Sequence, residues 1–202
     1  MKNEIIRLFS SRRNRVRLIE GCDGPVVEKR FACGHDAENE AAIYRLLDGS
    51  GLKAARLLKQ EGALLILSFL EGEDFLTLLE RQEREGLSLE PWIGLLEWLA
   101  SFHRVTGLIQ RDMNLRNFLW HDGIAAGIDF EDCSSGDLTE MFAQLAAYVL
   151  LYERPHTETK ERIAACIQSY AVQSLHCKEH EYTEHFAQAQ EMLTQRRRNR
   201  RR

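Results

Sequence analysis

The sequence lacks any long uncharged apolar segment. Its best apolar run, Ala63 to Leu70, falls far short of the ~18 residues that a membrane-spanning helix requires and fits a buried strand. Met1 to Glu4 carry no signal-peptide core, so we expect a cytoplasmic protein without membrane attachment. With 202 residues, 44% of them hydrophobic, the chain can still bury a core, as one domain or as two small lobes.

Cysteines are few, and none belongs to a C-x-x-C pair. The five cysteines are Cys22, Cys33, Cys133, Cys166 and Cys177. An odd number without paired spacing indicates free thiols in a reducing compartment rather than a disulfide framework.

Acidic residues are absent from the C-terminal end. Residues 196–202 contain six arginines, and removing these six charges from the formal charge of −4 leaves about −10 for the rest of the chain. So charged a segment does not pack, and we expect a disordered tail. A tail that only keeps the protein soluble is the simplest interpretation. Binding of RNA or an acidic protein through its arginines is the alternative.

The N-terminal third alternates short apolar runs with turn residues, which predicts an antiparallel sheet. Lys29 lies in the third run. The expected strands cover residues 4–9, 15–19, 26–31, 57–58 and 63–67.

A helix is predicted from Ala37 to Leu47, with Asp36 as its N-cap. Glu40 shares a helical face with the apolar residues three, four and seven positions further on, so this face packs inward. Glu38 lies on the other side. An inward glutamate needs a cation, and Lys29 is the natural partner.

The C-terminal two thirds are mainly helical in pattern. Helices are expected near residues 74–85, 91–103, 137–152, 159–175 and 179–194. Strands followed by helices indicate an α+β fold with two lobes.

Between the helical segments lies the stretch from Gln110 to Asp132, which contains Asp112, Asn117 and Asp129. Apolar runs flank an Asp-Gly pair at residues 122–123, which is a strong hairpin signal. Such a hairpin would bring Asn117 and Asp129 to the same end. One carboxylate to orient a hydroxyl, with an amide oxygen and a second carboxylate for Mg²⁺, is the set that phosphoryl transfer from ATP requires.

The chain contains Lys29, Glu40, Asp112-x-x-x-x-Asn117 and Asp129-Phe130 in that order. In these residues and their order the sequence resembles the protein-kinase-like superfamily. Residues 99–103 and 128–132 are similar to patterns of its aminoglycoside and choline phosphotransferase branch, of which this chain would be a compact member. The resemblance implies a bilobal protein-kinase-like fold. The N-terminal lobe, 1–70, would have a small antiparallel sheet with one helix. The mainly helical catalytic lobe would cover 71–195, before the tail at 196–202.

The resemblance also implies roles for individual residues. Asp112 would be the catalytic base or hydroxyl-orienting group, and Asn117 and Asp129 would bind Mg²⁺. Lys29 would bind the α- and β-phosphates of ATP, with Glu40 positioning it. The backbones of two residues at the end of the fifth strand would meet the adenine, namely Ser68 and Leu70.

Departures from the family pattern occur at three places. Gln110 replaces the usual histidine before the catalytic loop, and Glu131 stands where protein kinases have glycine. The expected phosphate loop, residues 10–14, has no glycine to let backbone amides approach a phosphate. Arg12 and Arg13 could replace that cradle with side-chain charge, or could form a solvated turn.

The sequence therefore predicts an ATP- and Mg²⁺-dependent phosphotransferase, a kinase acting on the hydroxyl of a small molecule. Size and the arginine tail leave a compact Ser/Thr protein kinase or an RNP-associated kinase or ATPase as an alternative. The glycine-free loop and Gln110 leave a catalytically inactive nucleotide-binding scaffold as another.

Overall fold

The structure is a computed structural model that describes residues 4–9, 11 and 13–200, with the backbone alone at 199 and 200. It divides into two compact units. The first comprises Met1–Glu71 together with Gly127–Glu131, and the second comprises Gly72–Ala126 together with Asp132–Arg202. The division after Glu71 lies one residue beyond the expected lobe boundary. The inclusion of Gly127–Glu131 in the first unit was not foreseen.

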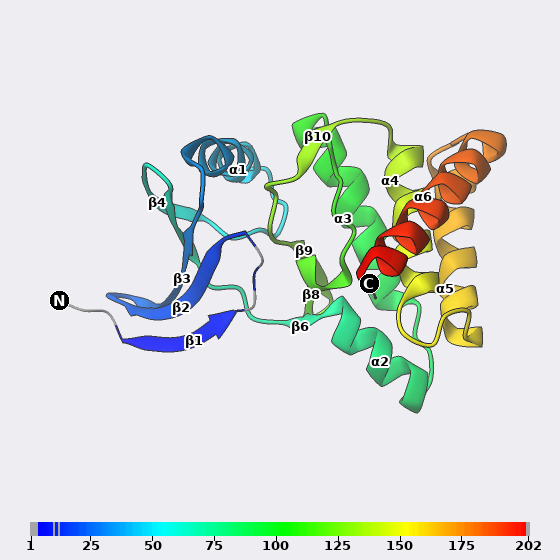
Figure 1. Cartoon of the computed structure of the whole chain (residues 1–202), viewed down its shortest axis with the longest axis horizontal. Coiled ribbons are helices and arrows are strands. Elements are labelled where there is room, and N and C mark those ends of the chain that lie inside the picture. Colours follow the sequence, from blue (N-terminus) through cyan, green and yellow to red (C-terminus); the bar gives the residue numbers. More distant parts are fainter. Residues whose placement is uncertain (1–3, 10, 12, 201–202) are drawn as a thin grey trace. The chain divides into compact units, whose positions relative to one another are not determined.

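The first unit contains a five-stranded antiparallel sheet in the order β1-β2-β3-β5-β4 (Figure 1). Its strands are β1 (Ile5–Phe9), β2 (Arg15–Gly21), β3 (Gly24–Arg30), β4 (Leu57–Glu61) and β5 (Leu64–Ser68). All five expected strands are confirmed. Lys29 is in the central strand β3, where it pairs with Val16 of β2 and Leu65 of β5. A central position keeps its backbone fixed by hydrogen bonds on both sides.

Helix α1 (Gly34–Leu47) belongs to the same unit as this sheet and begins earlier than expected. Its N-cap is Cys33, which makes no side-chain cap hydrogen bond, so the assignment of Asp36 as N-cap is wrong. Asp36 lies instead in the first turn, where its charge favours the positive end of the helix dipole. The expected inward face is confirmed, because Glu40 and the apolar residues at its helical spacing are all buried.

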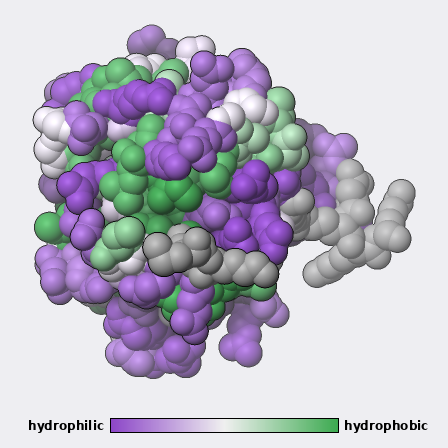
Figure 2. Space-filling model, turned by 90° about the vertical axis from the view of Figure 1, so that its left-hand side faces the viewer, coloured by the Kyte–Doolittle hydropathy of each residue, from purple (hydrophilic) through white to green (hydrophobic). Residues whose placement is uncertain are grey.

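Strand β1 forms an edge of the sheet and carries exposed apolar side chains. Ile5, Ile6 and Leu8 are 44%, 51% and 64% exposed. Figure 2, seen from this side, shows hydrophobic residues among hydrophilic ones. Arg7 lies over the Phe9 ring at 5.1 Å. A charged side chain on an edge strand opposes pairing with another chain.

The second unit is mainly helical, as expected, and the chain is α+β (Figure 1). Its helices are α2 (Phe75–Glu85), α3 (Glu90–Thr106), α4 (Leu138–Leu151), α5 (Glu158–Ser169), the π-helical segment η2 (Tyr170–Ser174) and α6 (Glu179–Arg200). Two small sheets join them, β6-β8-β9 and β10-β7. Their strands are β6 (Glu73–Asp74), β7 (Leu108–Gln110), β8 (Phe118–His121), β9 (Ile124–Gly127) and β10 (Cys133–Ser135).

The hairpin of β8 and β9 is confirmed, with its turn at Asp122 and Gly123. Both residues have positive φ, 48° and 78°, as the favoured two-residue hairpin turn requires. Asn117 ends the short 3-10 helix η1 (Leu115–Asn117) directly before β8.

The core of the second unit is built from aromatic rings and from α4. Phe75 meets Trp92 edge-on with ring centroids 5.2 Å apart, and Trp98 stacks on Phe102 at 5.3 Å. Most residues of α4 are buried. The helix starts at its N-cap Asp137, whose carboxylate accepts the Thr139 amide at 2.6 Å. A buried α4 is a rigid base for the loops that precede it.

Residues 196–200 of the expected disordered tail are helical, because α6 continues to Arg200, and residues 201 and 202 lie outside the described residues. Leu193, buried against α4, anchors the last turns, and arginine is a good helix former. The charge of these residues therefore does not prevent order.

Among the described residues, no helix combines the length and apolarity needed to cross a membrane.

Candidate active site

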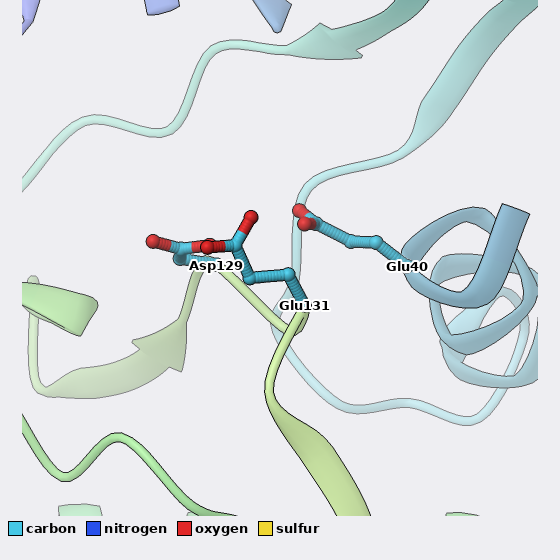
Figure 3. A group of neighbouring side chains, drawn as sticks. All are labelled: Glu40, Asp129 and Glu131. Carbon is cyan, nitrogen blue, oxygen red and sulfur yellow. The ribbon is translucent and has the colours of Figure 1, made fainter. Parts of the chain in front are cut away.

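In the first unit, Lys29 lies among three carboxylates. Its Nζ is 2.6 Å from Glu40 Oε2, 2.6 Å from Asp129 Oδ1 and 3.6 Å from Glu131 Oε2. Glu40 projects from α1, and Asp129 and Glu131 come from the segment after β9 (Figure 3). Carboxylate oxygens of these three residues lie within 4.8 Å of one another. The expected pairing of Lys29 with Glu40 is present, and Asp129 joins it.

Burial shifts the pKa values of the charged groups in this cluster. Glu40 is 0% exposed. Burial raises the pKa of Glu40 to about 7, against the opposing effect of Lys29, and the charges of Asp129 and Glu131 add to the rise. Burial also disfavours the charge of Lys29, yet Glu40 and Asp129 together raise its pKa above the ordinary range. The ammonium therefore stays charged, and Glu40 is the group that titrates near neutrality.

The backbone at Asp129 has φ 64°, the left-handed region that few residues other than glycine adopt. On one side Gly127 bridges to Ala54, and on the other Phe130 is buried with its ring edge-on to Tyr44 at 5.1 Å. Burial raises the pKa of Tyr44 well above its usual range, and the charges of Glu40 and Asp129 add to this. The buried Phe130 fixes the segment, so the Asp129 carboxylate is held at Lys29.

The turn between β1 and β2 is attached to the same cluster. The Asn14 side-chain amide donates a hydrogen bond to Glu131 Oε2, and Arg13 Nη1 lies 3.9 Å from Glu131 Oε1. Asn14 also donates its backbone N–H to Ser11 Oγ at 3.2 Å. Arg12, a predicted phosphate ligand, lies outside the described residues. Asn14 was missed, since no sequence pattern links it to a residue 117 positions away.

In the second unit, Asp112 and Asn117 lie together. The Asn117 side-chain amide donates to the Asp112 backbone carbonyl at 3.1 Å and to Asp112 Oδ2 at 3.3 Å. The Tyr148 hydroxyl donates to Asp112 Oδ1 at 3.2 Å. Both carboxylate oxygens of Asp112 are thus oriented by neighbours from η1 and α4.

Two tyrosines, Tyr148 in α4 and Tyr152 at the C-cap of that helix, hold the loop around Asp112. The Tyr152 hydroxyl donates to Asn114 Oδ1 at 2.7 Å and accepts the Leu115 amide at 3.1 Å. Burial raises the pKa of Tyr152 to about 12. Burial and the Asp112 charge raise the pKa of Tyr148 as well. The sequence analysis missed both residues. Two tyrosines four positions apart in an apolar helical segment indicate a pair of hydroxyl groups on one helix face, which could have pointed to them.

The residues before Asp112 are anchored to β10. Arg111 donates to Ser134 Oγ and to the Ser135 carbonyl, both at 2.8 Å, and forms an ion pair with Glu140. Gln110 is fully buried. Its side-chain oxygen accepts a hydrogen bond from Cys133 Sγ at 3.1 Å. Gln110 therefore has a structural partner in this fold, and Cys133 is a packed residue beside it.

Ser68 and Leu70, the predicted adenine contacts, lie at the end of β5 and just beyond it, and both are half-buried. Ser68 exchanges hydrogen bonds with Arg56: its backbone N–H donates to the Arg56 carbonyl at 2.9 Å, and its hydroxyl accepts the Arg56 amide at 2.8 Å. The backbone N–H of Ser68 is therefore already used within the first unit, so any adenine contact at this residue falls to its carbonyl group.

Comparison with known proteins gives matches at the level of structure alone. No protein-family model matches the chain, and no curated protein matches its sequence. Among solved structures, the amicoumacin kinase hAmiN in complex with AMP-PNP, Ca²⁺ and Ami is similar, with a TM-score of 0.65 and 13% identity over 92% of this chain and 72% of that one. The Rio2 kinase–ADP/Mg²⁺–phosphoaspartate complex from Chaetomium thermophilum has a TM-score of 0.53 and 14% identity over 94% of this chain and 62% of that one.

The chain has a protein-kinase-like fold. The fold expected from Lys29, Glu40, Asp112, Asn117 and Asp129 is thereby confirmed. The structure brings together two groups of these residues: Lys29 with Glu40 and Asp129 in the first unit, and Asp112 with Asn117 in the second. At 13–14% identity the comparisons concern architecture, so the chemistry rests on these residues themselves.

Proposed function

We propose that the chain is an ATP- and Mg²⁺-dependent phosphotransferase that phosphorylates a hydroxyl group of a small molecule. The observation that carries this proposal is Lys29, buried and held at 2.6 Å by both Glu40 and Asp129. A buried lysine fixed by a helix carboxylate is the group that binds nucleotide phosphates in protein-kinase-like enzymes.

The two residues predicted to bind Mg²⁺ have side chains of suitable chemistry. Carboxylate and amide oxygens are the ligands that Mg²⁺ prefers, and Asp129 and Asn117 provide one of each. The nitrogen of the Asn117 amide donates to Asp112, which turns its oxygen away from that carboxylate and leaves it for a cation. When bound, the ion would offset negative charge on the phosphates.

In the proposed reaction Asp112 orients the acceptor hydroxyl and takes its proton as the hydroxyl oxygen bonds to the γ-phosphorus of ATP. The bond between that phosphorus and the β,γ-bridging oxygen breaks, and ADP leaves. Tyr148 and Asn117 hold the two Asp112 oxygens, so the carboxylate is positioned before the acceptor binds. Lys29 offsets charge on the phosphates, while Glu40 keeps its ammonium in place.

The inactive-scaffold alternative gains little from Gln110, because this residue is buried and hydrogen-bonded behind Asp112 without displacing it. The glycine-free turn is also compatible with activity. Asn14 and Arg13 attach it to Glu131 of the Lys29 cluster by side-chain contacts, so this attachment does not depend on glycine.

ATP turnover with a panel of hydroxylated metabolites tests the proposal. Asp112→Asn is expected to lower kcat by roughly 100-fold or more, because general-base catalysis contributes at least that factor. Asp122→Asn, in the exposed hairpin turn, is the matched control and should leave turnover unchanged. Lys29→Met should abolish the rise in Tm that Mg·ATP produces in the wild-type protein. A wild-type Tm that Mg·ATP does not move would refute nucleotide binding.

A further inference from the structure

The proposed reaction leaves the arginine-rich end of α6 without a role, although this end lies near the Asp112 loop. Helix α6 runs along α4 (Figure 1), and the two helices meet through Ala147, Ala189 and Leu193. Tyr148 packs against this same cluster, and its hydroxyl bonds Asp112. The last buried residue of α6 is therefore one side chain away from the residue that holds the proposed catalytic carboxylate.

Helical spacing separates the arginines beyond Leu193 into two groups. Arg196 and Arg197 follow Leu193 by three and four residues, so they share its face toward α4. Arg198 follows by five residues, which places it well away from that face. The charge of Arg196 acts on Tyr148, where it opposes the rise in the pKa of that hydroxyl. Arg196 thus lies close to the Asp112 loop by packing and by charge.

Arg196 and Arg197 carry charge that the described part of the protein does not neutralise. Both are exposed, as is Arg198, and no ion pair of Arg196 or Arg197 occurs among the described side chains. A basic residue at a helix C-terminus also favours the helix dipole, but that effect applies to Arg198 equally. Guanidinium groups bind phosphate and carboxylate through paired hydrogen bonds, so an anion beside Asp112 would find two donors.

We propose that Arg196 and Arg197 bind an anionic group of the acceptor, so that the hydroxyl compound phosphorylated by this chain carries a phosphate or carboxylate. This inference rests on the proposed function, because Asp112 defines where the acceptor hydroxyl lies. It narrows the substrate class from hydroxyl compounds in general to acidic ones. Neutral or cationic acceptors would leave both guanidinium groups unmatched beside the reacting hydroxyl.

The test compares Arg196→Gln/Arg197→Gln with Arg198→Gln in the full chain saturated with Mg·AMP-PNP. Glutamine keeps helix propensity while removing charge. Binding of inorganic phosphate, 3-phosphoglycerate and glycerol is measured at constant ionic strength. Phosphate and 3-phosphoglycerate are expected to bind the wild type and Arg198→Gln alike and the double variant at least roughly tenfold more weakly, since each hydrogen bond to a charged group contributes about that factor. Glycerol binding should not change.

Four results would overturn the inference. Equal loss in Arg198→Gln and in the double variant, or binding of a 20-mer RNA that all three substitutions weaken, would indicate a diffuse polyanion surface. A weaker affinity of the double variant for AMP-PNP itself would assign the arginines to the nucleotide. Absence of phosphate and 3-phosphoglycerate binding in the wild type would remove the site. AMP-PNP affinity, measured first, reports separately whether the proposed function itself fails.

Discussion

Replacing Glu40 with glutamine should remove a pH dependence of stability from the first unit. Because burial raises the pKa of Glu40 to about 7, the folded state binds its proton more tightly than the unfolded state, whose carboxyl titrates near ~4.3. Such a group contributes stability that is complete below the unfolded pKa and is lost as pH rises through the folded pKa. Stability should therefore fall from about pH 4.5 to about pH 7.

The size of the effect follows from the same pKa values. Integrating the difference in bound protons between pH 5 and pH 8 gives a loss of roughly 2.5 kcal/mol. Glu40 is 0% exposed, so solvent does not screen the effect. Glu40→Gln carries no titrating proton, and this component of the pH dependence should disappear.

Amide hydrogen exchange of β3 and α1, corrected for the intrinsic exchange rate at each pH, measures this stability within the first unit. Glu38→Gln is the matched control, because Glu38 is an exposed residue of the same helix and should keep the wild-type slope. If wild type and Glu40→Gln lose protection in parallel between pH 5 and 8, the raised pKa of Glu40 and the electrostatic description of the cluster are wrong.

Two further substitutions test the second unit. Tyr148→Phe removes the hydroxyl that holds Asp112. We expect kcat to fall roughly 3- to 30-fold with little change in the KM for ATP. The control is Tyr182→Phe, which should match wild type because the Tyr182 hydroxyl has no partner among the described residues. Lys160 is 1% exposed and donates to two loop carbonyls at 2.6 and 2.9 Å. Lys160→Met should therefore lower the free energy of unfolding in urea by roughly 2–4 kcal/mol, whereas the exposed Lys178→Met should change it by less than about 0.5 kcal/mol; equal effects would contradict the structural role of Lys160.

The features that sequence predicted well depend on short-range spacing. The hairpin at Asp122-Gly123 follows from the backbone preference of two residues, and the inward face of α1 follows from helical periodicity. The pairing of Lys29 with Glu40 spans only eleven positions, and it required one assumption, that a buried acid needs a cation. These patterns are local, so a single sequence contains enough information to read them.

The features that sequence missed depend on contacts between distant segments. Tyr148 meets Asp112 across 36 positions, and Asn14 meets Glu131 across 117. Each pair is set by how helices and turns pack, which one sequence does not reveal. The prediction of disorder at residues 196–200 is wrong for a related reason, because their charge does not reveal that Leu193 packs on α4.

The cluster around Lys29 contains more acidic than basic side chains. When Glu40 is ionised, three carboxylates face the Lys29 ammonium and the Arg13 guanidinium, which lies 3.9 Å from Glu131. These charges sum to −1 where a triphosphate is proposed to bind. The raised pKa of Glu40 lessens this charge near neutrality, and the buried Lys29 keeps its own charge because the acids surround it. A site with this excess of acids repels an anion that arrives alone and favours one accompanied by a divalent cation. The three carboxylates that hold the lysine are thus a physical reason to expect the proposed dependence on a metal ion.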